Sequence, residues 1–329
     1  MLKSLRAMAV AAATLSAGAA AAGELKLAHF MSTKHPDHNG VFLPMGEKLA
    51  TATNGDVTLR VYPGGELGAG PRDQYARAVD GIADLAFALP GYTASTFPMT
   101  LLVELPGAVA DANKSTEALW ANVDHLAKEF RRAELIGLWT NPPAVIYSRE
   151  KPIRTLADLA GLKIRVPSRN AGLVVEAWGG TPVSMPAPGM YNALQTGVID
   201  GALIDQGSVL SFKLGEVTKY MTVGMQSQIS PFMVVMNRDS FDGLSADEQA
   251  KLKEIGREMS LVAQANRVGA AKKGADVFAG MEGHELITLS DEEAAKFDAA
   301  SAALLENVVA DLEGQGLKAA DFVAALQAD

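Results

Sequence analysis

The fold is decided by residues 155–205, which read TLADLAGLKIRVPSRNAGLVVEAWGGTPVSMPAPGMYNALQTGVIDGALID. Within this stretch, the apolar run 162–166 ends before a proline and predicts a buried strand. Ser168 can cap the helix that follows, and Gly179 ends it. A further helix leads into a second apolar strand at 198–204. This strand–helix–strand order predicts an α/β fold with a parallel sheet.

Two helix starts are marked by a hydroxyl residue that is followed three positions later by an acid. Thr155 with Asp158 and Ser245 with Glu248 both fit this capping box. The second pair precedes a long helix, and the apolar positions that recur along it are Leu252, Ile255, Met259 and Val262. Two more helices are expected: one with a stripe of Leu119, Val123, Leu126 and Phe130, and one that runs from Ser290 to Gly314.

Two arginines flank the turn from strand to helix in the opening stretch. Arg165 lies near the carboxyl end of the strand, and Arg169 lies in the first turn of the helix. Open α/β sheets bind ligands at that edge. A guanidinium has a planar fork of donors that matches a carboxylate, and the N–H groups of a helix start also attract an anion. The pair therefore fits a carboxylate ligand, although spacing alone equally allows either arginine to pair with a surface acid.

Several other residues follow predicted strands and are candidates for ligand contact. Phe30 and His35 lie where the first strand passes into a polar loop. Tyr92 leaves a short apolar strand, and it can either reach a cleft or pack between lobes. Asp205 and Gln206 follow the strand 198–204, and we expect them to form hydrogen bonds with hydroxyl or keto groups of the ligand. The alternative for Asp205 is a solvated position in a loop.

Three of the five histidines, His29, His35 and His38, lie in or beside one loop, which raises the possibility of a metal site. No carboxylate cluster or second histidine pair elsewhere completes such a site. Motifs of serine hydrolases, zinc peptidases and P-loop enzymes are absent from the sequence, and the glycines of 64–70 have the wrong spacing for a dinucleotide fingerprint. We expect no enzyme activity and no cofactor. A receptor that binds a metal ion through His29, His35 and His38 is kept as an alternative to a receptor for a carboxylate.

Charge and the beginning of the chain indicate where the protein works. The 329 residues carry a formal net charge of −9, which argues against nucleic acid as a partner, and they include no cysteine. Lys3 and Arg6 precede a short apolar run and then three alanines that end at Ala22. Residues 1–22 are therefore expected to be a secretory signal peptide, because the run is too short for a membrane span. The mature protein is expected to be soluble in the periplasm.

Several ordered motifs carry a family resemblance that covers nearly the whole mature chain. They are DLAGLKIRVPS, GGTPVSMP, YNALQTGVIDG, LAHFMSTKHPDHNG, VYPGGELGAG and VDGIADLAFALPGY. Together they closely resemble the solute-binding proteins of TRAP (tripartite ATP-independent periplasmic) transporters, the DctP family. The resemblance implies a two-lobed fold like that of class II periplasmic binding proteins, with a hinge and a ligand cleft between the lobes. It also implies that Arg165 grips the ligand carboxylate.

The resemblance further implies partners and a ligand class. The partners are a small organic carboxylate and the small and large subunits of a membrane permease, without an ATPase, and the receptor is expected to be a monomer. Gly189 stands where the family usually has glutamate, and Ile204 stands where many members have asparagine. Val145 stands where sialic-acid-type members have a second arginine, which argues against sialic acid. GYTASTFP and MPAPGMY resemble the branch that handles aromatic, hydroxy or keto monocarboxylates, and a C4-dicarboxylate stays open.

The division into lobes follows from where the chain crosses between sheets. The break Asn141-Pro142-Pro143 suits the first crossing, and a later β run brings the chain back. We expect lobe I to comprise 23–142 and 232–282, and lobe II to comprise 143–231 and 283–329. Two crossings of this kind make a hinge, so we expect the lobes to close around the ligand.

Overall fold

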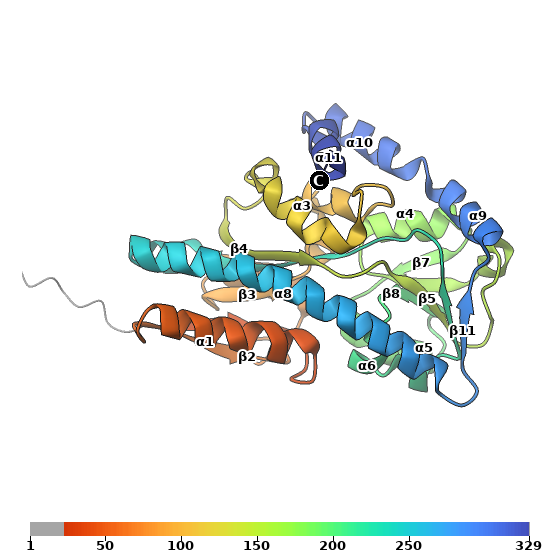
Figure 1. Cartoon of the computed structure of the whole chain (residues 1–329), viewed down its shortest axis with the longest axis horizontal. Helices are drawn as coiled ribbons and strands as arrows, with labels where there is room; N and C mark the ends of the chain where they lie inside the picture. Colours follow the sequence, from red (N-terminus) through yellow and green to blue (C-terminus); the bar gives the residue numbers. More distant parts are fainter. Residues whose placement is uncertain (1–22, 329) are drawn as a thin grey trace, which may run out of the picture.

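The computed structural model describes residues 23–328, and the predicted signal peptide 1–22 lies outside them. Two sheets organise the fold (Figure 1). The first has the order β2 (Val57–Tyr62), β1 (Gly23–Ala28), β3 (Leu85–Ala88), β10 (Pro231–Asn237) and β4 (Ala133–Thr140). The second has the order β11 (Glu285–Thr288), β9 (Tyr220–Val223), β5 (Val145–Ser148), β8 (Gly201–Ile204), β6 (Lys163–Val166) and β7 (Thr181–Ser184). We call the halves built around these sheets lobe I and lobe II.

The expected two-lobed α/β fold is confirmed, but the prediction of parallel sheets is only partly right. β6 pairs in parallel with β7 and β8. In contrast, β10 runs antiparallel to both of its neighbours, and β5 does the same in the second sheet. These two strands are the ones that the chain enters directly from the other lobe, without a helix between. They therefore run against the strands that follow strand–helix connections.

The helices cover both sheets. They are α1 (Leu43–Ala52), α2 (Gln74–Val79), α3 (Ser115–Ala121), α4 (Arg169–Ala177), α5 (Met190–Gln195), α6 (Ser208–Ser211), α7 (Arg238–Asp242), α8 (Ala246–Ala279), α9 (Asp291–Ser301), α10 (Leu304–Gly314) and α11 (Ala319–Ala328). Shorter helical turns are η1 (His38–Phe42), η2 (Pro71–Asp73), η3 (Pro90–Thr96), η4 (Thr100–Glu104), η5 (Ala112–Lys114), η6 (Val123–Leu126), η7 (Leu156–Leu159), η8 (Ala187–Gly189) and η9 (Leu214–Glu216). Within residues 23–328, none of them is both long and apolar enough to cross a membrane.

The 34-residue helix α8 extends along both lobes (Figure 1). It begins at the predicted capping box of Ser245 and Glu248, and the box at Thr155 is present as well. Two glycines let α8 approach other backbone closely: a Cβ on Gly256 would overlap the carbonyl of Ile136 in β4, and a Cβ on Gly274 would overlap the carbonyl of Gln206. The single helix α8 is thus packed tightly against both lobes.

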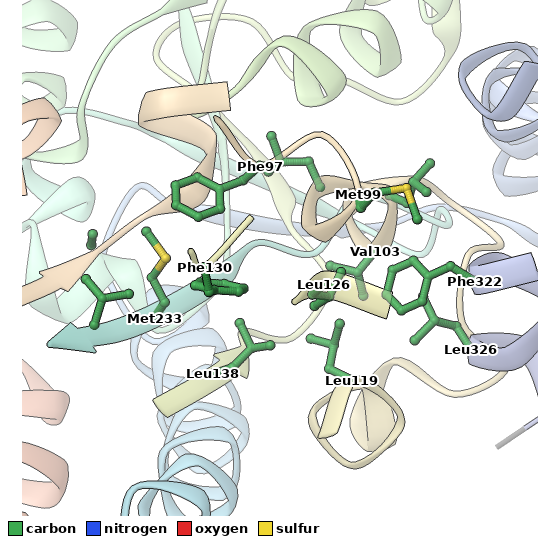
Figure 2. Close-up of a cluster of buried hydrophobic side chains, with 14 of the residues drawn as sticks. Phe97, Met99, Val103, Leu119, Leu126, Phe130, Leu138, Met233, Phe322 and Leu326 are labelled. Atoms are coloured by element: carbon green, nitrogen blue, oxygen red, sulfur yellow. The ribbon is translucent and has the colours of Figure 1, made fainter. Parts of the chain in front are cut away.

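The largest apolar cluster lies on one face of the first sheet (Figure 2). Phe322 and Leu326 of α11 pack there with Leu119 of α3 and Val103 of η4. The whole segment 283–329 was expected in lobe II, but α10 and α11 pack on lobe I, because their apolar side chains complete this cluster. The other boundaries of the two lobes stay a prediction.

Two predicted helices are broken in the structure. The stripe from Leu119 to Phe130 is divided between α3 and η6, because the backbone leaves helical geometry at Asn122. The helix expected from Ser290 is interrupted between α9 and α10. Phe297 of α9 belongs to a cluster of lobe II, whereas Leu312 of α10 belongs to the cluster in Figure 2. The chain changes lobes at this point, so one straight helix could not bury both residues.

Candidate ligand-binding site

Arg165 lies on β6. Just after this strand, Ser168 caps α4 by accepting a hydrogen bond from the N–H of Ala171 at 3.1 Å. The Arg165 side chain is only 1% exposed. Its Nε donates to the carbonyl of Met185 at 2.9 Å, and Nη2 donates to the hydroxyl of Tyr92 at 3.3 Å. No acid of residues 23–328 lies within ion-pair distance of this guanidinium. Burial lowers the pKa of Arg165 from its usual value, which shows how poorly this place solvates a cation.

Tyr92 connects the two lobes at this point. It belongs to η3, which follows β3 of lobe I. Its hydroxyl accepts from the N–H of Ala187 at 2.8 Å and from Arg165, and both partners belong to lobe II. The sequence left open whether Tyr92 contacts a cleft or packs between the lobes. The side chain does both, because it joins the two lobes and also lines a cavity.

One cavity brings together five of the residues that the sequence singled out. Phe30, His35, Tyr92, Arg165 and Asp205 all line it. Much of the remaining wall is apolar and comprises Met31, Pro36, Leu89, Pro167, Ala187, Leu203, Ile204, Phe212 and Phe232. Ile204, which stands where many family members have a polar residue, contributes to this apolar surface. The cavity therefore combines one unpaired guanidinium with aromatic and aliphatic walls.

Asp205 is 7% exposed and is held in place by one of its oxygens. Oδ2 accepts from Nδ2 of Asn141 and from Oγ of Ser208, each at 3.2 Å. Gln206, which we also predicted to contact the ligand, does not line the cavity. Its carbonyl accepts from the hydroxyl of Tyr147 at 2.9 Å and faces α8 at Gly274. The chain turns back toward α8 after Asp205, so the next side chain leaves the cavity.

Arg169 was predicted to supplement Arg165, and the structure places it elsewhere. Its side chain is exposed and borders a surface groove beside α10 instead of the cavity. The space at the start of α4 is occupied by Glu104 of η4, whose Oε2 accepts from Oγ of Ser168 at 2.6 Å. Burial raises the pKa of Glu104 to about 8, so this carboxyl is neutral at pH 7. A glutamic acid of lobe I thus takes the place that we expected a ligand anion to take.

The loop histidines hydrogen-bond to each other and to the backbone. His29 and His38 share a hydrogen bond of 3.0 Å between Nε2 and Nδ1, so each ring already occupies a nitrogen of the other. Nδ1 of His35 accepts from the N–H of Asp37 at 3.2 Å. Within residues 23–328, no group of three or more histidine, cysteine, aspartate or glutamate side chains could hold a metal ion. The alternative of a metal-binding receptor gains no support.

Arg267 of α8 also lines the cavity, although it was not among the residues predicted from the sequence. The residue is 6% exposed, pairs with the carboxylate of Asp37 at 2.5 Å and stacks over the ring of Phe232 at 3.8 Å. A signal was present in the sequence: Arg267 lies eight residues after Met259, on the buried stripe of the long helix. A charged residue on such a stripe needs a buried partner, which makes it a candidate for a site.

Comparison with known proteins agrees with this geometry. A family model described as bacterial extracellular solute-binding protein, family 7, matches residues 27–311. Among characterised relatives, the 2,3-diketo-L-gulonate-binding periplasmic protein YiaO of Escherichia coli K12 is 27% identical over 250 residues, which cover 75% of each chain.

Solved structures resemble the chain over nearly its full length. A TRAP solute-binding protein from Rhodoferax ferrireducens T118, solved with copurified benzoate, is 26% identical with a TM-score of 0.85, and the match covers 93% of this chain and 97% of that one. A marine metagenome TRAP solute-binding protein specific for aromatic acid ligands, solved with 3-hydroxybenzoate, is 29% identical with the same TM-score and the same coverage.

Proposed function

The chain belongs to family 7 of the bacterial extracellular solute-binding proteins, and from this premise we propose that its cavity takes a small aromatic, hydroxy or keto monocarboxylate. The protein is a periplasmic receptor of the TRAP type and not an enzyme. Receptors of this kind bind small organic acids and work with membrane permease components. The ligand class and the roles of individual residues are our proposal.

One observation carries the proposal: Arg165 is a buried cation without an acidic partner in the described part of the chain, and it lines an otherwise largely apolar cavity. An unpaired charge in such a place costs several kcal/mol, and a carboxylate held in a bidentate pair would offset that cost. Nε already donates to the carbonyl of Met185 in the same lobe, which orients the guanidinium before a ligand arrives, and Tyr92 adds its hydroxyl when the lobes meet. We assign Arg165 the role of carboxylate clamp and Tyr92 the role of holding it once the lobes meet.

The other walls favour a ring over a flexible dicarboxylate. Phe30 and Tyr92 lie with their ring centroids 6.0 Å apart, and Phe232 closes the cavity beneath Arg267. A second ligand carboxylate would need another unpaired cation. Arg267 is already paired with Asp37, and Asp205 would repel the added charge. A C4-dicarboxylate is therefore the less favoured alternative.

Lobe closure is the motion that fits these contacts. Besides the bond between Tyr92 and Arg165, Glu104 of lobe I bonds Ser168 of lobe II, and Nδ2 of Asn170 donates to the carbonyl of Leu101 at 2.8 Å. We propose that ligand binding draws the lobes together through these contacts, and that a monomer in the closed form is what the small and large permease subunits recognise.

The test is a binding survey on protein that has been unfolded and refolded to strip copurified ligand. Thermal shift and calorimetric titration with benzoate, phenylglyoxylate, lactate and succinate should show an aromatic monocarboxylate as the tightest ligand. Arg165→Ala should abolish most of that affinity, while Arg169→Ala, an exposed arginine four residues away, should leave it within about twofold. Tightest binding of succinate, or equal affinity in Arg165→Ala, would refute the proposal.

A further inference from the structure

The hydrogen bonding of His35 fixes which of its nitrogens carries a proton. Its Nδ1 accepts from the backbone N–H of Asp37 at 3.2 Å, while the carboxylate oxygen of Asp37 lies 4.0 Å away, beyond hydrogen-bond distance. A neutral imidazole that accepts at Nδ1 must carry its hydrogen on Nε2. Burial lowers the pKa of His35 to about 4, so the ring is neutral at pH 7. Nε2 is therefore an N–H donor.

This donor has no partner among the residues that the structure describes. His35 is 5% exposed and lines the cavity, and its Nε2 makes no hydrogen bond to any of residues 23–328. A largely buried donor without an acceptor is unfavourable by the cost of its lost hydration. A ligand atom that accepts a hydrogen bond would remove that cost.

Asp205 supplies the complementary group on the same cavity. Its Oδ2 is occupied by Asn141 and Ser208, whereas Oδ1 accepts no hydrogen bond from the residues that the structure describes. Asp205 lines the same cavity as His35 and Arg165, and its negative charge acts electrostatically on both. The wall of the cavity thus presents a donor and an acceptor in addition to the carboxylate clamp.

We propose that His35 and Asp205 together select ligands that carry a hydroxyl group as well as a carboxylate. The inference rests on the proposed function and narrows it. A hydroxyl accepts from Nε2 of His35 and donates to Oδ1 of Asp205, so it satisfies both groups at once. A keto oxygen accepts only, and it would face the lone pairs of Asp205. A site built to bond a hydroxyl rejects an analogue that lacks it, because its own polar groups are then left unpaired.

Matched ligand pairs test the selection and locate the hydroxyl. Calorimetric titration compares 3-hydroxybenzoate with benzoate, for a hydroxyl on the ring, and mandelate with phenylglyoxylate, for a hydroxyl beside the carboxylate. We expect the hydroxyl to improve affinity by about tenfold or more in at least one pair. Affinities within about threefold in both pairs would overturn the inference. If Arg165 is still required for binding in that case, the proposed function survives, whereas failure of all four acids to bind overturns both.

Variants connect the preference to the two side chains. His35→Phe keeps a ring but removes the donor, and Asp205→Asn removes the charged acceptor, so each should reduce the hydroxyl preference to about threefold or less. His125→Phe, a matched change at an exposed histidine outside the cavity, should keep the wild-type ratio. A ratio that survives in both cavity variants refutes the selecting roles of His35 and Asp205. Long-range ¹H–¹⁵N NMR on the wild-type protein is an independent check, since it should show the Nε2–H tautomer for His35, and the Nδ1–H tautomer would contradict the argument.

Discussion

Replacing Glu104 by glutamine should change how the stability of the protein depends on pH. Glu104 is fully buried, its Oε2 accepts from Ser168 across the two lobes, and its Oε1 has no partner among the described residues. Burial raises the pKa of this carboxyl from 4.5 to about 8. The folded protein therefore holds a proton that the unfolded chain releases between these two pH values.

The sign follows from that difference in bound protons. Below pH 4.5 the carboxyl is neutral in both states and costs nothing; as the pH rises toward 8, the unfolded chain gains the free energy of ionising and the folded state does not. At about 1.36 kcal/mol per pH unit, the free energy of unfolding should fall by roughly 3 kcal/mol between pH 5 and pH 7.5 because of Glu104 alone. Glu104→Gln should remove this slope while an amide oxygen still accepts from Ser168.

The assay is urea denaturation of both proteins at intervals from pH 5 to pH 8. The difference between variant and wild type should be small at pH 5 and should grow in favour of the variant with rising pH. Burial also raises the pKa of Glu129, to about 7, but that residue is common to both proteins and cancels in the difference. Parallel stability curves across the range would show that Glu104 is ionised in the folded protein and would refute the reasoning.

Four further outcomes are expected. Arg165→Ala should weaken binding of the best carboxylate by about 30-fold to several thousand-fold, with Arg165→Lys between it and the wild type, as measured by calorimetry. Gly274→Ala should destabilise the protein by about 1–3 kcal/mol, because its Cβ would overlap the carbonyl of Gln206, whereas Gly269→Ala on the same helix meets nothing within 4 Å and should be neutral or stabilising in thermal melts. Small-angle scattering should show compaction on adding a ligand that raises the melting temperature, and an unchanged radius would contradict lobe closure. Removal of metal ions with a chelator should leave the melting temperature unchanged, since His29 and His38 already bond each other.

Local signals in the sequence were enough to predict the secondary structure around the clamp. Pro167 after an apolar run, and Ser168 at a capping position, determine where β6 ends and α4 begins, and both features depend only on neighbouring residues. The motif around Arg165 could therefore be recognised without knowledge of tertiary contacts.

The residues that were missed or misplaced depend on contacts between distant segments. Arg169 lies next to the clamp in sequence, but Glu104 from the other lobe fills the helix start that it was expected to share with a ligand. Arg267 reaches the cavity from a helix about one hundred residues later in the chain, and only its place on a buried stripe marked it. The reversal of β5 and β10 likewise follows from the path of the chain between lobes, which hydrophobic periodicity does not encode.

The two close-packed glycines of α8 restrict how the lobes can move. Gly256 and Gly274 are eighteen residues apart, which is five full turns at 3.6 residues per turn, so both face the same side of the helix about 27 Å from each other. One touches lobe I at Ile136 and the other touches lobe II at Gln206. While the helix stays straight, the separation of these two carbonyls is constant. Opening must then be a rotation about the line that joins them, or it must bend the helix between the two glycines.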